Sequence, residues 1–313
     1  MEKLQVKNAV VTGAAGFIGY HLIKNLQEKG VFVVALCRQE SVHNSRLDEF
    51  HNIKVIECDS SEILLYTEEI KQYHPDVFFH LSWEGSTGEM RGAYDVQLKN
   101  IRNTCDAYIC AARIGCQKFV ATGTVYEKLT NQIMEMEQFS TLSYYVLAKK
   151  FAYDSIFQLS KKEGLDWTWC QFCQPIGKYI KLNQLIAYLV TELKKKRKPQ
   201  FGTAENPFDI IVVEDLAEGL YLAGVCKLKE KKYYIGSGHA RVLKEYLKEA
   251  RDIIAPDVKL VFGERPDDGL LFYYEWLDTR AFKQETGFTN KYSFAEGIKK
   301  VEQWVEEVRQ HEE

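Results

Sequence analysis

Short apolar runs alternate with longer amphipathic segments along the first half of the chain. The apolar runs have the length of buried strands, and the amphipathic segments repeat their apolar residues with helical spacing. The expected strands are Ala9–Thr12, Val31–Cys37, Ile53–Cys58, Val77–Leu81, Lys118–Thr122 and Trp167–Phe172. The expected helices are Phe17–Lys29, Ile63–Tyr73, Val96–Ile114 and Ser143–Lys162. This alternation predicts an α/β fold of Rossmann type, with helices on both faces of a doubly wound parallel sheet.

The pattern becomes less regular after Pro175. The expected helices there are Leu182–Lys196, Glu214–Ala223, Leu243–Ile254 and Phe294–Gln310, and the expected strands are Asp209–Val213, Tyr233–Ile235 and Val258–Phe262. We therefore expect residues 1–175 to form the parallel-sheet domain, with residues 207–225 returning to it. Residues 176–313 would form a smaller mixed α/β domain.

Composition and charge exclude several classes of protein. The chain has 313 residues, 41 Lys and Arg against 44 Asp and Glu, a net charge of −3 and 46% hydrophobic residues, which is typical of a soluble globular protein. A general nucleic-acid binder is usually basic over a whole domain, so no nucleic-acid partner is expected. The sequence has no apolar run of membrane-spanning length, and Met1–Asn8 does not resemble a signal peptide. We expect a cytoplasmic protein with no membrane partner.

The eight cysteines are expected to be free thiols, because nothing in the sequence indicates secretion. Cys170 and Cys173 have CxxC spacing, but a zinc site would need a second ligand pair and a redox site would need a helix start. His21, His80 and His239 are isolated from one another. No metal site is expected.

A glycine-rich turn joins the first strand to the first helix, in the sequence Thr12-Gly13-Ala14-Ala15-Gly16-Phe17-Ile18-Gly19. Gly13 suits a tight turn, Gly16 lets a pyrophosphate approach the backbone, and Gly19 lets the helix pack close to the sheet. The helix start offers unpaired N–H groups to the phosphates. The turn therefore predicts dinucleotide binding by the first domain, which leaves residues 176–313 to bind the substrate.

The end of the second strand favours NADP as the cofactor. NAD-binding proteins usually carry an Asp or Glu there, whereas this chain has Cys37 and Arg38. A guanidinium suits a 2′-phosphate through charge-assisted hydrogen bonds. NAD remains the alternative, because a small shift of the loop would bring the Glu40 carboxylate to the ribose.

Tyr145 and Lys149 are four residues apart on an expected helix, so they lie on one face. A phenol is a poor base at neutral pH, and a nearby ammonium favours the phenolate. Thr122 ends the fifth strand, at the edge where parallel sheets place their ligands. Thr122 could hold the substrate oxygen that Tyr145 protonates or deprotonates.

With these residues the chain resembles the extended short-chain dehydrogenase/reductases, in the NAD-dependent epimerase/dehydratase branch, from about Asn8 to Trp304. The matching segments are TGAAGFIG at 12–19, Cys58-Asp59, His80-Leu81-Ser82, Asn100, Thr122 to Tyr126, Tyr145 with Lys149, and Val213 to Ala217. The resemblance implies a catalytic triad of Thr122, Tyr145 and Lys149. It implies a cofactor site of Gly13, Ala15, Gly16, Phe17, Ile18, Arg38, Asp59, Ser60, Leu81, Ser82, Asn100, Tyr145, Lys149, Pro175 and Ile176.

Departures from the family pattern narrow the expected activity. The family's 4,6-dehydratases carry an Asp-Glu pair after the strand-five Thr, where this chain has Gly123 and Thr124. GDP-fucose synthase-like enzymes carry a Cys at the Thr124 position and a His beyond the strand-six turn, where this chain has Lys178 and Tyr179. The segment His80 to Gly85, with Arg91 and Gln97, instead resembles CDP-abequose or CDP-paratose synthase-like 4-ketoreductases.

These comparisons predict an NADP-dependent reductase of a nucleotide-linked 4-keto-6-deoxy sugar. The nucleotide-diphosphate sugar would contact Trp83, Glu84, Thr124, Gln174 and Arg265. An NAD-dependent 4-epimerase is the first alternative, and a non-catalytic dinucleotide sensor the second. The resemblance also implies a homodimer built on the helices Val96–Ile114 and Ser143–Lys162, with Tyr108, Phe151 and Tyr153 as candidate contacts.

Overall fold

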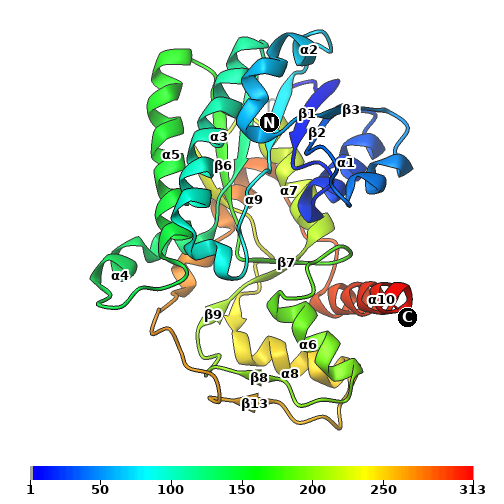
Figure 1. The fold of residues 1–313 in the computed structure, drawn as a ribbon, viewed down its shortest axis with the longest axis vertical. Helices are drawn as coiled ribbons and strands as arrows, with labels where there is room; N and C mark the ends of the chain where they lie inside the picture. Colours follow the sequence, from blue (N-terminus) through cyan, green and yellow to red (C-terminus); the bar gives the residue numbers. More distant parts are fainter. Residues whose placement is uncertain (1–2, 313) are drawn as a thin grey trace.

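The computed structural model describes residues 3–312, and its centre is the predicted parallel sheet (Figure 1). The sheet has seven strands in the order β11-β6-β5-β4-β1-β2-β3, and every neighbouring pair is parallel. The strands are β1 (Asn8–Thr12), β2 (Phe32–Cys37), β3 (Ile53–Glu57), β4 (Val77–His80), β5 (Lys118–Thr122), β6 (Asp166–Gln171) and β11 (Lys232–Tyr234). The strand order reverses between β1 and β4, which is where doubly wound sheets open a ligand crevice. The predicted fold class is confirmed.

Helices cover both faces of this sheet. On one face α3 (Tyr94–Arg113) packs along α5 (Ser143–Glu163), and on the other α1 (Phe17–Glu28) packs along α7 (Val213–Val225). The side chains of β1 alternate accordingly, since Ala9 and Val11 belong to one buried cluster and Val10 to another. Both faces of the strands are therefore apolar, as a sheet buried between two helical layers requires.

Much of the chain after β6 forms a smaller region, which Figure 1 shows below the sheet. Three helices pack around its core, namely α6 (Leu185–Lys194), α8 (Leu243–Ile254) and α10 (Phe294–Glu312). Three short strand pairs accompany them: β7 (Gln174–Ile176) with β10 (Ile210–Val212), β8 (Gln200–Phe201) with β13 (Val261–Phe262), and β9 (Pro207–Phe208) with β12 (Arg241–Val242). The helix α9 (Arg280–Thr286) lies against β11.

The chain returns to the main sheet twice after Pro175. Helix α7 packs on the sheet, and strand β11 extends its edge beside β6. Strand β10, within the segment predicted to return, instead pairs with β7 outside the main sheet. The division into residues 1–175 and 176–313 stays a prediction.

Short helical turns are the main difference from the predicted elements. The segment expected as one helix over Ile63–Tyr73 is a 3₁₀ turn, η2 (Ser60–Tyr66), followed by α2 (Thr67–Lys71). The Asp59 side chain starts η2 by accepting a hydrogen bond from the Ser61 amide. The other unpredicted helical pieces are too short for helical periodicity: η1 (Asn44–Glu49), η3 (Glu89–Gly92), η4 (Val125–Leu129), α4 (Thr130–Glu135), η5 (Tyr274–Leu277) and α9 (Arg280–Thr286).

All eight cysteines are free in the structure, and Cys105 alone is not fully buried. Burial raises the pKa of the Cys170 thiol to about 12. Over residues 3–312, no group of three or more His, Cys, Asp or Glu side chains is arranged to hold a metal ion. In the same range, every helix is too short or too polar to cross a membrane.

Candidate active site

The glycine-rich turn leaves the start of α1 open to an anion. Gly13 has a φ of 66°, which favours glycine. A Cβ at Gly19 would lie 2.2 Å from the Gly13 carbonyl oxygen, so the helix can pack this closely on the turn only with glycine there. The N-cap residue of α1, Gly16, supplies no capping side chain, and the first turn has no acidic residue. The first amides of α1 are therefore available to a phosphate.

A buried hydrogen-bond bridge ties this turn to the segment after β4. The Thr12 hydroxyl lies 3.0 Å from His80 Nδ1, and it accepts hydrogen bonds from the amides of Leu81 at 3.1 Å and Ser82 at 3.2 Å. Burial lowers the pKa of His80 to about 3, so its ring is neutral. The Ser82 hydroxyl lies 2.8 Å from that of Ser60. Four residues predicted for the cofactor site, Gly13, Ser60, Leu81 and Ser82, thus lie together at the switch point.

Arg38 follows β2 directly, and its side chain is exposed. One of its guanidinium nitrogens lies 4.0 Å from the Glu84 carboxylate. Asp59 accepts hydrogen bonds from the amide and hydroxyl of Ser61, which lower the pKa of its carboxyl. The Asn100 amide is also engaged within the chain, because it bonds to the backbone N–H and C=O of Glu84 at 3.0 and 2.8 Å. Their roles toward a cofactor stay predictions.

Sequence reasoning missed a cation beside the glycine-rich turn. Arg46, on η1, donates a hydrogen bond of 3.1 Å to the carbonyl of Ala15 and stacks over the Tyr179 ring at 4.1 Å. Tyr179 in turn packs on Trp304 of α10. No motif marks Arg46, because these contacts join segments far apart in the sequence.

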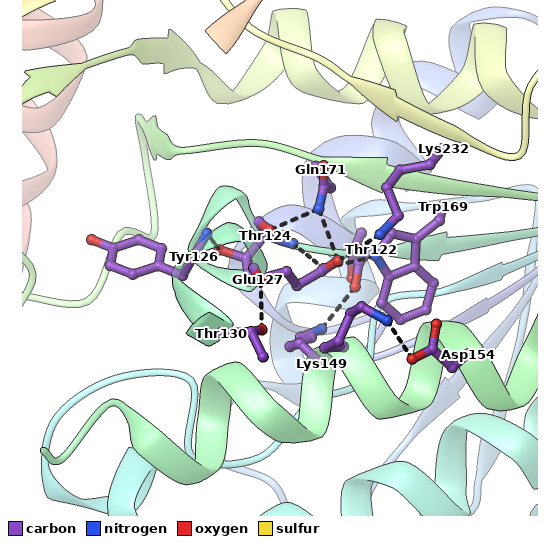
Figure 2. Close-up of polar contacts among 11 residues, drawn as sticks. Thr122, Thr124, Tyr126, Glu127, Thr130, Lys149, Asp154, Trp169, Gln171 and Lys232 are labelled. Carbon is purple, nitrogen blue, oxygen red and sulfur yellow. Dashed lines mark hydrogen bonds and ion pairs between the residues drawn. The ribbon is translucent and has the colours of Figure 1, made fainter. Parts of the chain in front are cut away.

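Of the three residues predicted as catalytic, Thr122 lies at the C-terminal end of β5 and Lys149 lies on α5 (Figure 2). Tyr145 lies on α5 as well, one helical turn before Lys149. Lys149 is buried and donates a hydrogen bond of 2.7 Å to the carbonyl oxygen of Thr122. Tyr145 is also buried, and its ring meets Trp83 edge-on with 6.2 Å between ring centroids. The same Trp83 indole covers Lys149, whose Nζ lies 3.6 Å from the ring centroid. Helix α5 and the loop after β4 therefore enclose the proposed acid–base pair.

Burial acts on the two titratable groups in opposite directions. It raises the pKa of Tyr145, while the Arg91 charge and a hydrogen bond with the Thr124 side chain act to lower it. Burial lowers the pKa of Lys149 to about 7, against the charge of Glu127. Arg91 lies 5.5 Å from the centroid of the Tyr145 ring. The role of Arg91 beside Tyr145 was not foreseen, because its loop lies on a different part of the chain.

The residues predicted to contact the substrate do not all gather in one place. Thr124 is buried beside Tyr145, and Trp83 has its indole N–H anchored on Gln97 Oε1 at 3.0 Å. Gln174, on β7, donates to the Pro175 carbonyl at 3.1 Å and to the Gln184 side chain at 3.2 Å. Its amide is therefore already engaged within the chain, and its contact with a diphosphate stays a prediction.

Arg265 borders a separate cleft of about 430 Å³ in the C-terminal region. The cleft is also lined by Asn183, Leu185, Tyr188, Gln200, Phe201 and Gly202. The Arg265 guanidinium donates a hydrogen bond of 3.1 Å to the Tyr188 hydroxyl. Aromatic rings beside an exposed guanidinium can accept a planar base and an anionic group.

Known proteins are similar to this chain in sequence or in fold. The model of the NAD dependent epimerase/dehydratase family matches residues 9–236. CDP-abequose synthase from Salmonella typhimurium is 22% identical over 272 residues, covering 84% of this chain and 87% of its own. UDP-glucose 4-epimerase from Thermotoga maritima, solved with UDP-glucose, superposes with a TM-score of 0.75 at 20% identity over 98% of this chain and 100% of its own.

A dTDP-glucose 4,6-dehydratase from Streptomyces venezuelae, solved with NAD bound, has a TM-score of 0.77 and 21% identity over 97% of this chain and 98% of its own. These solved structures have three-dimensional folds like that of this chain. The family model covers well over half of the sequence, including the glycine-rich turn and the Tyr145–Lys149 pair. The protein belongs to the NAD dependent epimerase/dehydratase family and is an NAD(P)-dependent oxidoreductase of the extended short-chain dehydrogenase/reductase type.

Proposed function

We propose that the protein is a cytoplasmic, NADP-dependent reductase of nucleotide-linked 4-keto-6-deoxy sugars. The observation that carries this proposal is the end of β5, where Gly123 and Thr124 occupy the positions of the dehydratases' Asp-Glu pair. A Cβ at Gly123 would lie 2.0 Å from Trp169 Nε1 and 2.6 Å from Glu127 Oε1, so a side chain has no room there. The acid–base work then falls to Tyr145, and reduction of a ketone needs one proton and one hydride.

In the proposed reaction the open start of α1 would hold the cofactor pyrophosphate, and a bound nicotinamide would supply a hydride to C4. Thr122 orients the C4 oxygen. The Tyr145 hydroxyl transfers its proton to that oxygen, which converts the carbonyl into an alcohol and leaves a phenolate. Lys149 in its protonated form and the Arg91 guanidinium stabilise that phenolate until solvent returns the proton. Burial excludes water from the reacting atoms and strengthens these charge interactions.

The preference for NADP rests on the excess of cations around Arg38. The charges of Arg46, Lys181 and Arg38 all act to lower the pKa of His43, after burial as the first cause. Arg38 also lowers the pKa of Lys181, again after burial. The 2′-phosphate of NADP would relieve this mutual repulsion, whereas the ribose hydroxyls of NAD would not.

The cleft at Arg265 supports a nucleotide-diphosphate substrate. Tyr188 offers an aromatic side chain to a base, and Arg265 offers paired donors to a phosphate. Arg265 carries an exposed charge, so it can pair with a ligand without a large desolvation cost.

A substrate panel tests the proposal directly. Purified protein is mixed with CDP-, dTDP- and GDP-linked 4-keto-6-deoxy sugars, and the oxidation of NADPH and of NADH is followed at 340 nm. We expect turnover with at least one sugar and faster turnover with NADPH. Binding of NADPH without turnover on any sugar would favour the dinucleotide sensor instead.

A 4-epimerase is the second candidate, because oxidation and re-reduction at C4 need the same three residues. The partial pairing of Arg38 with Glu84 favours it, since Glu84 weakens the cationic site for a 2′-phosphate. An epimerase must retain its oxidised cofactor. Stoichiometric NAD released by denaturing the freshly purified protein, together with conversion of a UDP-sugar without added cofactor, would establish this alternative.

We also infer a homodimer from the outer faces of α3 and α5. Leu98 and Phe151 are 59% and 60% exposed, and Tyr94, Tyr144 and Phe157 are exposed around them. Of the earlier candidates, Tyr108 is wrong as a contact because it is fully buried and its hydroxyl bonds to the Leu165 carbonyl. Tyr153 packs on Trp167 and Trp169 within its own chain. An apolar surface of this kind is typical of an association site.

A further inference from the structure

One buried carboxylate beside the proposed catalytic centre has no place in the mechanism above. Glu127 lies on η4, just after β5, and is 3% exposed. It was not singled out by any sequence motif. Such a group is costly to bury unless its charge is compensated.

The Glu127 carboxylate is saturated with donors, two on each oxygen (Figure 2). Oε1 accepts hydrogen bonds from the Thr124 amide at 2.9 Å and from Trp169 Nε1 at 2.8 Å. Oε2 accepts from Gln171 Nε2 at 2.8 Å and from Lys232 Nζ at 3.2 Å. An ionised carboxylate is an acceptor only, so this environment suits the charged form.

These contacts reach the catalytic residues by two short routes. Glu127 and Thr124 form a capping box, which fixes the segment that carries Thr122 and the Thr124 hydroxyl beside Tyr145. The Trp169 indole that donates to Glu127 also faces Lys149, whose Nζ lies 5.8 Å from its ring centroid. Position 123 must be glycine for the carboxylate and the indole to lie this close to β5.

We propose that Glu127 is a positioning residue, which holds the Thr122–Thr124 segment in place and supplies the buried negative charge that favours protonated Lys149. The inference rests on the proposed catalytic roles of Tyr145 and Lys149. Its electrostatic part, however, is a property of the free protein and can be measured without a substrate.

The surroundings of Lys149 and Glu127 come from several elements. Lys149 faces Trp83 after β4, neutral His80 on β4, the Thr122 carbonyl on β5 and Trp169 on β6, with Tyr145 on its own helix. Glu127 faces Lys232 on β11, and its charge also acts on Lys128, Tyr145 and Tyr153. Within this set Glu127 is the anion that opposes the burial of Lys149.

Two variants separate the electrostatic role of Glu127 from its role in holding the Thr122–Thr124 segment. They are expected to shift the pKa of Lys149 in opposite directions. Glu127→Gln removes the negative charge, so the pKa of Lys149 falls from its value of about 7 by about one unit. Lys232→Met leaves the capping box and three donors intact but removes the cation that offsets Glu127, so the pKa of Lys149 rises. Asp154→Asn is the matched control, because it removes an exposed carboxylate of α5 that pairs with Lys150.

The pKa of Lys149 is read by NMR titration of protein labelled with ε-¹³C-lysine, with the signal assigned by its loss in Lys149→Arg. In the active enzyme, the alkaline limb of the kcat/KM profile for reduction moves to lower pH in Glu127→Gln and to higher pH in Lys232→Met. The proposal is overturned if the two variants shift the pKa of Lys149 in the same direction, or if Glu127→Gln leaves that pKa at the wild-type value. If the protein has no reductase activity but the two variants still shift the pKa of Lys149 in opposite directions, as expected, the proposed function is overturned and this inference stands.

Discussion

The Lys149 ammonium on α5 lies over the indole of Trp83, which is in the loop after β4, and its Nζ is 3.6 Å from the ring centroid. A ring face attracts a cation, and the same ring removes water from it. Burial lowers the pKa of Lys149 to about 7, and the Trp83 ring is part of what encloses the ammonium.

Trp83→Ala is therefore expected to raise the pKa of Lys149, since water can then solvate the ammonium. The alkaline limb of the kcat/KM profile should move to higher pH by about one unit. Trp83→Phe keeps an aromatic ring over the ammonium, so it should move the alkaline limb less. A limb that moves to lower pH in Trp83→Ala would mean that the ring contributes more attraction than desolvation.

Tyr145→Phe removes the proposed proton donor and keeps the ring that packs on Trp83. We expect kcat for ketone reduction to fall by about 10²- to 10⁴-fold, because general acid catalysis is lost. The affinity for NADPH and the melting temperature should stay close to those of the wild type. Near-normal turnover would exclude Tyr145 as the acid.

Arg38→Ala should weaken NADPH binding about 10- to 100-fold and leave NADH binding almost unchanged, because only NADPH carries the 2′-phosphate. Isothermal titration calorimetry on the free protein measures both. Glu84→Gln serves as the companion variant: it frees Arg38 from its ion partner, so NADPH should bind more tightly. Equal losses for both cofactors in Arg38→Ala would assign NAD instead.

Gly123→Ala should destabilise the protein by about 3 kcal/mol or more, since the new methyl group collides with Trp169 and Glu127. Denaturant unfolding measures the loss. Adding Trp169→Phe should restore part of the stability by removing the pyrrole side of the indole. If the single variant were as stable as the wild type, the tight packing under β5 would be disproved.

The apolar surface of α3 and α5 predicts a dimer that charge can disrupt. Leu98→Asp with Phe151→Asp should convert the protein to a monomer in analytical ultracentrifugation, because both side chains are largely exposed in the single chain. Leu65→Asp, at an exposed residue of η2, is the control and should leave the sedimentation coefficient unchanged. A wild-type protein that sediments as a monomer would remove the inference.

The alternation of apolar runs and amphipathic helices by itself determined the parallel sheet, because both signals are local and repeat regularly. The same holds for the turn at Gly13–Gly19 and for the spacing of Tyr145 and Lys149, which depend on neighbours within one helical turn or one strand end. The sequence also predicted the ends of strands β1, β4 and β5 to within two residues, since a buried apolar run stops where polar residues begin.

Only the tertiary structure decided which side chains surround Tyr145 and Lys149 and the glycine-rich turn. Arg91 reaches Tyr145, Arg46 reaches Ala15, and Lys232 reaches Glu127 across 105 positions of sequence. The buried charge of Glu127, the pKa of Lys149 and the indole over its ammonium all depend on such long-range contacts. Sequence periodicity carries no record of them, because burial and charge are set by what the folded chain brings within a few ångströms.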